Sequence, residues 1–217
     1  MNIVVWSDFL CPYCLLGKAR LMVALERAGI ADAAVEVRSF LLNPGRSLPG
    51  VSMRSHLMEK YGYTETQVRA NFASLETAGR ALGLNMDLER AHHAGTDAAH
   101  ALFQYAKAND LGTAFSDRLQ RAAFCEGADL GDEHVLLAMA QETGLKLDGA
   151  RAALLDPAYF ARARDEYRDA LRLNVRGVPF FLFNGRLSLS GAVPVESFEA
   201  ALGRAAGQSA AAAERKE

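Results

Sequence analysis

The sequence is poor in cysteine, with three among 217 residues, and it has a single tryptophan and six prolines. An odd number of cysteines argues against a framework of structural disulfides. A chain of this length can bury a sizeable core without such bonds. No run of about eighteen apolar residues occurs, which argues against a membrane-spanning helix. These absences favour a globular protein whose cysteines serve another purpose.

Neither sign of charge dominates, since 24 Lys and Arg residues face 26 Asp and Glu residues, for a formal net charge of −2. This balance gives no reason to expect a nucleic-acid or membrane partner. The opening MNIVVWSDFL lacks the basic start and small-residue cleavage site of a secretory signal. We therefore expect a cytoplasmic protein of one domain, or of one domain that carries a large insertion.

The first 51 residues predict a β-α-β unit. NIVVWS (2–7) and AVEVRSF (34–40) have the β-branched content and alternation of strands. The stretch between them has helical spacing, and Gly29 suits the end of a helix. A connection of this length makes the two strands parallel.

Residues 156–206 predict an α-β-β-α segment. Asp156 suits the N-cap of a helix, and the dipeptide Asn184-Gly185 between two apolar stretches is typical of a type I′ hairpin. A last helix is expected over 194–207. We expect a disordered tail over 207–217.

The intervening residues, 52–155, show helical spacing without a predicted strand or a fixed-period repeat. The preceding turn-rich loop, 43–50, carries no assigned chemistry. We therefore expect an α/β protein in which the segments 1–51 and 156–206 form one mixed sheet with helices on both faces. The all-helical insertion would cap that sheet.

Two of the cysteines stand in SDFLCPYCLLGK (7–18), directly after the first predicted strand. Pro12 suits the first position of the helix, which places Cys11 at the N-cap, where unpaired backbone N–H groups favour a thiolate. Cys14 lies one turn later and is expected to face the protein. This arrangement predicts that Cys11 attacks a disulfide and Cys14 resolves the mixed disulfide.

The other uses of a cysteine pair fit less well. A zinc site would need a second pair of ligands, and Cys125, His92 and His93 lack ligand spacing, so we expect no metal. A purely structural disulfide would close so small a loop that it removes little chain entropy. We interpret Cys125 as a small buried helical residue, with a second redox role left open.

Three segments carry a resemblance to a known family: WSDFLCPYCLLGK (6–18), AAFCEGADLGDEHVL (122–136) and RGVPFFLFNGRLSLSGAVP (176–194). Together they resemble the DsbA-like thioredoxin-domain family, and within it the FrnE-like cytoplasmic branch. CPYC alone is weakly specific, because glutaredoxins use the same residues. Its combination with GVPFF before a hairpin is more specific. The resemblance implies a thioredoxin fold, β-α-β then α-β-β-α, with a helical insertion.

The resemblance also implies site residues and an activity. Pro179 would follow a cis peptide bond and face the cysteine pair, and the backbone of Val178 would pair with an extended substrate, beside Pro12 and Tyr13. A trans proline at the start of a strand is the alternative. The implied activity is thiol-disulfide exchange on protein or peptide cysteines. It would need no cofactor beyond the dithiol, with glutathione as a candidate co-substrate.

Two other functions stay open at this point. Kappa-class glutathione transferases and 2-hydroxychromene-2-carboxylate isomerases look similar but usually place Ser at the position of Cys11. A chaperone-like peptide-binding module would keep the fold without using its dithiol.

Four further polar residues have two possible roles each. Asp8 is either an acid that influences the site or a solvated loop acid. His92, His93 and His100 either line the cleft or are partly exposed structural residues. Trp6 is expected in the core.

Overall fold

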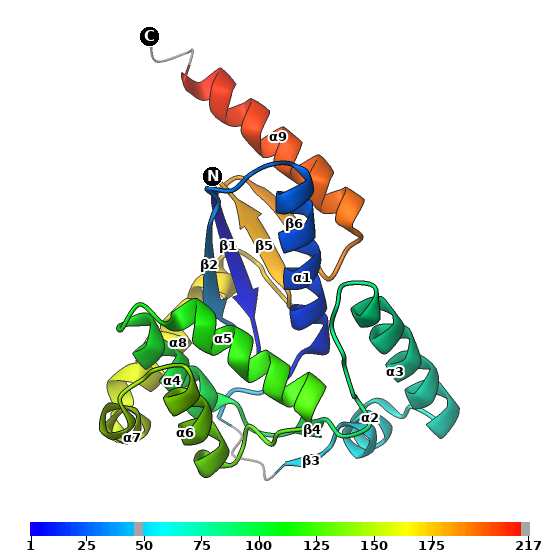
Figure 1. Cartoon of the computed structure of the whole chain (residues 1–217), viewed down its shortest axis with the longest axis vertical. Coiled ribbons are helices and arrows are strands. Elements are labelled where there is room, and N and C mark those ends of the chain that lie inside the picture. Colours follow the sequence, from blue (N-terminus) through cyan, green and yellow to red (C-terminus); the bar gives the residue numbers. More distant parts are fainter. Residues whose placement is uncertain (46–49, 214–217) are drawn as a thin grey trace.

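A four-stranded mixed sheet forms the centre of the computed structural model, which describes residues 1–45 and 50–213, with backbone alone over 208–213 (Figure 1). The strand order is β2-β1-β5-β6. Strands β1 and β2 are parallel and strands β5 and β6 are antiparallel, as the sequence predicted. Strand β5 also pairs antiparallel with β1, which joins the two segments into one sheet. The strand bounds are β1 Asn2–Ser7, β2 Ala34–Ser39, β5 Phe180–Phe183 and β6 Leu187–Ser190.

The sheet forms where the sequence places β-branched and aromatic residues. Ile3 on β1 lies opposite Phe183 on β5, and both side chains are fully buried. Asn184 and Gly185 both have positive φ, which a type I′ turn requires, so the hairpin prediction is confirmed.

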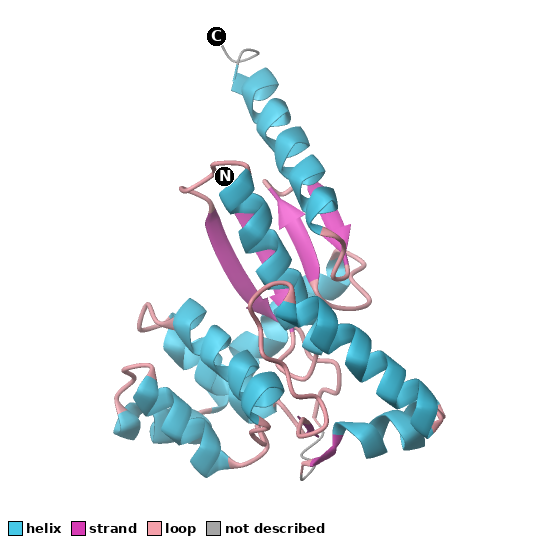
Figure 2. Cartoon of the chain, turned by 45° about the vertical axis from the view of Figure 1, so that its right-hand side comes forward, coloured by secondary structure: helices cyan, strands magenta, loops and turns pink. Residues whose placement is uncertain are grey.

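Helices cover both faces of the sheet (Figure 2). Helix α1, Pro12–Arg27, and helix α9, Val195–Ala213, pack together on one face over a core of apolar side chains from β1 and β5. Helix α8, Pro157–Arg172, covers the other face beside Trp6 and Phe40. As predicted, α8 begins at an Asp156 N-cap, whose carboxylate accepts the Ala158 N–H at 2.8 Å.

The remaining helices gather at the end of the sheet where β1 ends, in two groups that Figure 1 shows on either side of the start of α1. Many of their side chains share one core with Phe9, Leu15 and Leu16. The predicted fold class, a thioredoxin fold with a helical insertion, is therefore observed. The bounds are α2 Met53–Tyr61, α3 Glu65–Arg80, α4 Asp97–Lys107, α5 Gly112–Arg121, a π-helical turn Ala122–Glu126, α6 Glu133–Glu142 and α7 Leu147–Leu155.

Two sequence expectations differ from the structure. The helical stretch was expected to hold no strand, but β3, Val51–Ser52, pairs with β4, His92–His93. Each strand has two residues, too few for alternation to mark it. Helix α9 continues to Ala213, past the start expected for the disordered tail. Residues 214–217 of that tail, and 46–49 of the turn-rich loop, lie outside the described residues.

None of the helices in the described part of the chain combines the length and apolar character needed to cross a membrane.

Candidate active site at the start of helix α1

The CPYC motif lies where β1 ends and α1 begins, facing the helices of the insertion. Cys11 is the N-cap of α1 in an extended conformation, and Pro12 is the first helical residue, as predicted. The backbone N–H of Cys14 donates to the carbonyl oxygen of Cys11 at 2.9 Å. The two cysteines therefore share the first turn of one helix.

The two thiols are free and differ in environment. Cys14 is 1% exposed and Cys11 is 8% exposed. Burial raises the pKa of Cys14 well above its ordinary value, and the hydrogen bond and charge of Cys11 raise it further, against a smaller lowering by the Ser7 hydroxyl. Cys14 therefore keeps its proton at neutral pH, and Cys11 is the more accessible sulfur.

The Cys11 side chain differs from the expectation that the helix N–H groups would point at its sulfur. The structure gives it no capping hydrogen bond. Its Sγ instead donates to the carbonyl oxygen of Val178 at 3.5 Å. The sulfur therefore lies against the loop that precedes β5, far away in the sequence.

That loop contains the Val178–Pro179 peptide bond, which is cis, as the resemblance implied. Pro179 is buried, and its carbonyl oxygen accepts the Gly191 N–H at 2.8 Å. A Cβ atom at Gly17 of α1 would lie 2.8 Å from the Pro179 ring. The absence of a side chain at Gly17 thus lets the proline loop pack directly against the helix that carries both cysteines.

Pro12 and Tyr13, in the first turn of α1, face the insertion. Tyr13 is 42% exposed, and its hydroxyl accepts a hydrogen bond from Asn71 Nδ2 on α3 at 3.1 Å. Cys11, Pro12 and Tyr13 together line one side of a cavity of about 170 Å³, whose other wall comes from the loop after β2 and from α2 and α3. A small group can therefore approach the Cys11 sulfur from the insertion side.

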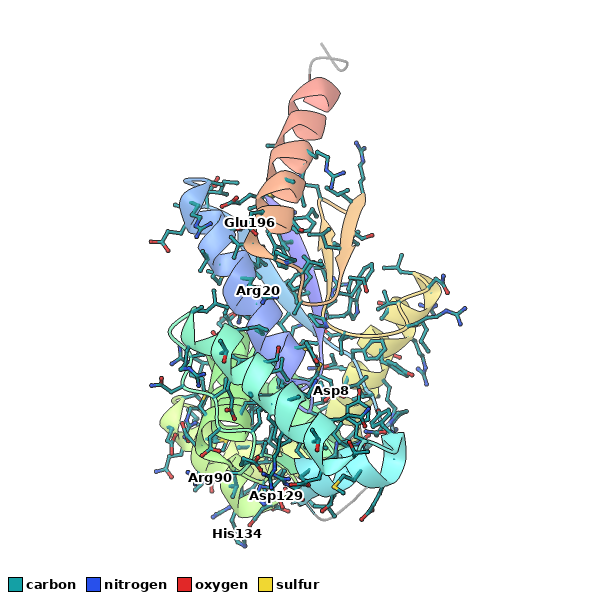
Figure 3. The ribbon with its side chains drawn as sticks, turned by 90° about the vertical axis from the view of Figure 1, so that its right-hand side faces the viewer. Asp8, Arg20, Arg90, Asp129, His134 and Glu196 are labelled. Atoms are coloured by element: carbon teal, nitrogen blue, oxygen red, sulfur yellow. The ribbon has the colours of Figure 1, made fainter. Side chains whose placement is uncertain are left out.

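Asp8 directly follows β1 (Figure 3). It is fully buried, so the alternative of a solvated loop acid is wrong. Its carboxylate accepts the N–H groups of Leu10 and Leu42 at 3.1 and 2.7 Å and the Thr96 hydroxyl at 3.1 Å. Nε2 of His100 lies 3.5 Å from Oδ1. Burial alone would raise the pKa of Asp8, but His100 and the two N–H groups outweigh it and hold that pKa below its ordinary value.

His93 and His100 are buried rather than partly exposed, whereas His92 is partly exposed. His100 is fully buried beside Asp8 and packs against Phe9, with ring centroids 4.5 Å apart and an interplanar angle of 35°. His93 is buried and lines the cavity next to Cys11, whereas His92 is half-buried and does not line it. Sequence reasoning placed these residues near the cleft but could not tell which of them enters it.

Cys125 lies in the π-helical turn and is half-buried rather than buried. Burial raises its pKa, against a smaller opposing effect of Arg121. It does not line the cavity at Cys11. Within residues 1–45 and 50–213, no group of three or more His, Cys, Asp or Glu side chains could hold a metal ion.

Sequence reasoning missed the part of the site that the insertion supplies. Asn43, His56, Lys60 and Asn71 reach the cavity from segments far from the CPYC motif. No local motif marks them, because their placement depends on how α3 packs against α1 and how α2 packs against α3.

Comparison with known proteins identifies a family for this chain. An uncharacterized protein of Bacillus subtilis, YwbO, is 28% identical over 208 residues, which are 93% of this chain and 96% of the relative. The crystal structure of a probable DsbA oxidoreductase from Streptomyces coelicolor is similar with 34% identity and a TM-score of 0.91, covering 95% of this chain and 90% of that one.

The cytosolic disulfide reductase DsbM of Pseudomonas aeruginosa, solved with GSH, shares the fold at 21% identity and a TM-score of 0.61, covering 94% of this chain and 98% of that one. The family model described as a DSBA-like thioredoxin domain matches residues 2–203. With its cysteine pair at the start of α1 opposite a cis-proline loop, the chain belongs to the DSBA-like thioredoxin domain family.

Proposed function

We propose that this protein is a thiol-disulfide oxidoreductase acting on protein or peptide cysteines through Cys11 and Cys14. The observation that carries the proposal is the unequal pair of free thiols at the start of α1. Cys11 lies at the edge of a cavity and against the cis-proline loop, while Cys14 is buried behind it. A nucleophile must meet its substrate, whereas a resolving thiol needs only to reach the nucleophile.

The proposed exchange needs no reactant other than the protein dithiol and the substrate disulfide. The Cys11 thiolate attacks one sulfur of a substrate disulfide, forms a Cys11–substrate disulfide and releases the other substrate sulfur as a thiolate, which takes up a proton. Cys14 then loses its proton and attacks the Cys11 sulfur. The second substrate thiolate leaves, and a Cys11–Cys14 disulfide remains. The reverse sequence transfers a disulfide to a substrate dithiol.

The loop before β5 supports a role in substrate placement. We propose that the backbone of Val178 pairs with an extended substrate segment, next to Tyr13 and Pro12. Pro179 has no N–H group, so it does not compete for the sulfurs or for the substrate carbonyl groups. The contact between Cys11 Sγ and the Val178 carbonyl oxygen supports this placement, because it brings a substrate sulfur beside the same backbone.

We further propose that no bound cofactor is needed beyond the dithiol, that glutathione is a co-substrate, and that the protein is a cytoplasmic, FrnE-like member. The similarity to DsbM, which was solved with GSH, supports glutathione as a co-substrate. The odd number of cysteines supports the cytoplasmic location. Two thiols at positions 11 and 14 argue against a glutathione-dependent isomerase or transferase, since those relatives usually have Ser at the position of Cys11.

Insulin reduction by dithiothreitol tests the proposal. We expect the wild-type protein to accelerate the reaction and Cys11→Ser to return it to the uncatalysed rate. Cys125→Ser is the matched control, because Cys125 does not line the cavity at Cys11; it should retain activity within about twofold of wild type. Full activity in Cys11→Ser would overturn the assignment of the nucleophile. Suppression of protein aggregation without any exchange activity would favour the chaperone-like function instead.

A further inference from the structure

The cavity beside Cys11 has an uneven distribution of charge. Lys60, His56 and His93 line it, and none of the described residues that line it is an Asp or a Glu. Within the described part of the chain, no carboxylate lies within ion-pair distance of Lys60. The cavity therefore offers a positive charge, with no acid among its described lining residues, close to the nucleophilic sulfur.

The basic groups are held in place by contacts with one another. Lys60 Nζ donates to Asn43 Oδ1 at 3.0 Å, and Asn43 Nδ2 lies 3.3 Å from His93 Nε2. The His93 ring stacks on His56 with centroids 3.3 Å apart and an interplanar angle of 11°. Lys60 Nζ also lies 5.5 Å from the centroid of the Tyr61 ring. These contacts form one polar wall made by α2, the loop after β2 and β4.

The rest of the cavity is mainly apolar. Its lining includes Leu10, Leu42, Met53, Leu57, Phe72 and Leu75, with Tyr13, Tyr61 and Asn71 as the further residues that carry polar atoms. An anionic group that enters is partly shielded from water, and such shielding strengthens its attraction to Lys60. The volume of about 170 Å³ corresponds to on the order of six water molecules at about 30 Å³ each, which suits a small molecule better than a folded segment.

We propose, building on the thiol-disulfide exchange proposed above, that this cavity selects small thiols and disulfides that carry a carboxylate close to the sulfur. The carboxylate would lie at Lys60 and Asn43 while the adjacent sulfur meets Cys11. Lys60 is then a residue that sets substrate specificity. It takes no part in the bond changes, which remain those of Cys11 and Cys14.

Three symmetric disulfides of similar length separate charge from size: 3,3′-dithiodipropionate is anionic, bis(2-hydroxyethyl) disulfide is neutral and cystamine is cationic. The reduced protein is mixed with each, and acid-quenched samples are analysed by mass spectrometry for the Cys11–Cys14 disulfide. Each turnover consumes one disulfide and the protein dithiol and yields two small thiols. Each rate is divided by that of a free model thiol, which removes the intrinsic reactivity of the probe.

We expect the normalised rate for the anionic disulfide to exceed that for the cationic one by about three- to tenfold, and the difference to shrink with added salt. Lys60→Met should remove most of this preference without lowering the rate for the neutral disulfide more than about twofold. The matched control is Lys146→Met, an exposed lysine at the start of α7 that does not line the cavity, and it should keep the preference.

Equal normalised rates for the three probes in the wild-type protein would overturn the inference and leave the exchange reaction intact. A preference that survives Lys60→Met unchanged would also overturn it. By contrast, mixed disulfides formed on Cys14 of Cys11→Ser with all three probes, at the rate at which the wild-type protein reacts, would contradict the proposed function itself.

Discussion

Asp8 is a charged residue without solvent access, three positions before Cys11, the proposed nucleophile. A buried carboxylate is tolerated only when its oxygens are hydrogen-bonded. Asp8 meets this condition through the Leu10 and Leu42 N–H groups and the Thr96 hydroxyl, and Nε2 of His100 lies 3.5 Å from its Oδ1. It thereby ties the loop before Cys11 both to the loop after β2 and to the start of α4.

Replacing Asp8 by Asn should lower the free energy of unfolding by about 2–4 kcal/mol at pH 7, because an acceptor for buried N–H groups is lost beside His100. The pKa of Asp8 is lower in the folded than in the unfolded state. The ionised Asp8 carboxylate therefore contributes its full stabilisation above about pH 4, the pKa of an Asp in the unfolded chain. This stabilisation is lost as the pH falls further, toward the lower pKa of Asp8 in the folded protein. Urea unfolding at several pH values should show a wild-type advantage that is constant from pH 5 to 7 and shrinks below pH 4.

The control for this experiment is Asp32→Asn, which makes the same chemical change at an exposed carboxylate in a loop. It should alter the free energy of unfolding by less than about 0.5 kcal/mol. If the difference in free energy of unfolding between wild type and Asp8→Asn grew toward acid pH, the pKa of Asp8 would not be lowered in the folded protein.

How well single residues could be predicted depends on how local their signal is. Cys11, Cys14 and Pro179 were found because each lies in a short motif next to a predicted element. The burial of Asp8 and the entry of Lys60 into the cavity could not be found in this way. Both depend on contacts with segments far away in the sequence, whose packing no local pattern specifies.

At the scale of elements, the site depends on one close contact between α1 and the cis-proline loop. A Cβ at Gly17 would lie 2.8 Å from Pro179 Cγ and 3.2 Å from Phe181 Cζ. Neither neighbour can give way easily, because the Pro179 ring is rigid and Phe181 is fully buried in the core. The absence of a side chain at Gly17 therefore sets how closely α1, which carries both cysteines, approaches the loop that contacts Cys11.

Gly17→Ala should reduce the free energy of unfolding by about 1–2 kcal/mol, because overpacking outweighs the higher helix propensity of alanine. It should also slow insulin reduction, since the loop moves relative to Cys11. Gly203→Ala on α9 is the matched control, because a Cβ there meets nothing within 4 Å. That change should stabilise the protein by up to about 1 kcal/mol. Equal effects of the two substitutions would show that the contact at Gly17 has no energetic importance.

Long elements were predictable and short ones were not. Helices α1, α3 and α8 and the hairpin of β5 and β6 carry caps or turn residues that the sequence displays. Strands β3 and β4 have two residues each, and they exist because α2 and the loop before α4 bring them together. Their pairing could not be read from either segment alone.

At the scale of the whole molecule, the insertion and the sheet are joined by one core and by a buried polar contact. The cluster that fills the insertion includes Phe9 and Leu15 from the sheet side. The Glu166 carboxylate of α8 accepts the Ser39 N–H and Gln104 Nε2, each at 2.7 Å, and pairs with Lys107. These contacts connect α8, β2 and α4.

We therefore expect the chain to unfold in one cooperative step. Trp6, the single tryptophan, is buried between the sheet and α8 and reports on the sheet, whereas far-UV circular dichroism reports mainly on the helices. The two urea transitions should coincide in midpoint and slope. Separate midpoints would show that the insertion is an independent folding unit.

The most direct test of the central claim is to trap the mixed disulfide. Cys14→Ser is incubated with a peptide disulfide, quenched in acid and mapped by mass spectrometry. Because the resolving thiol is missing, the account predicts that one peptide accumulates on Cys11, and that Cys11→Ser under the same conditions captures none on Cys14. Peptide captured on Cys125 of the Cys14→Ser variant with Cys11 unmodified, or on Cys14 of the Cys11→Ser variant, would contradict the account.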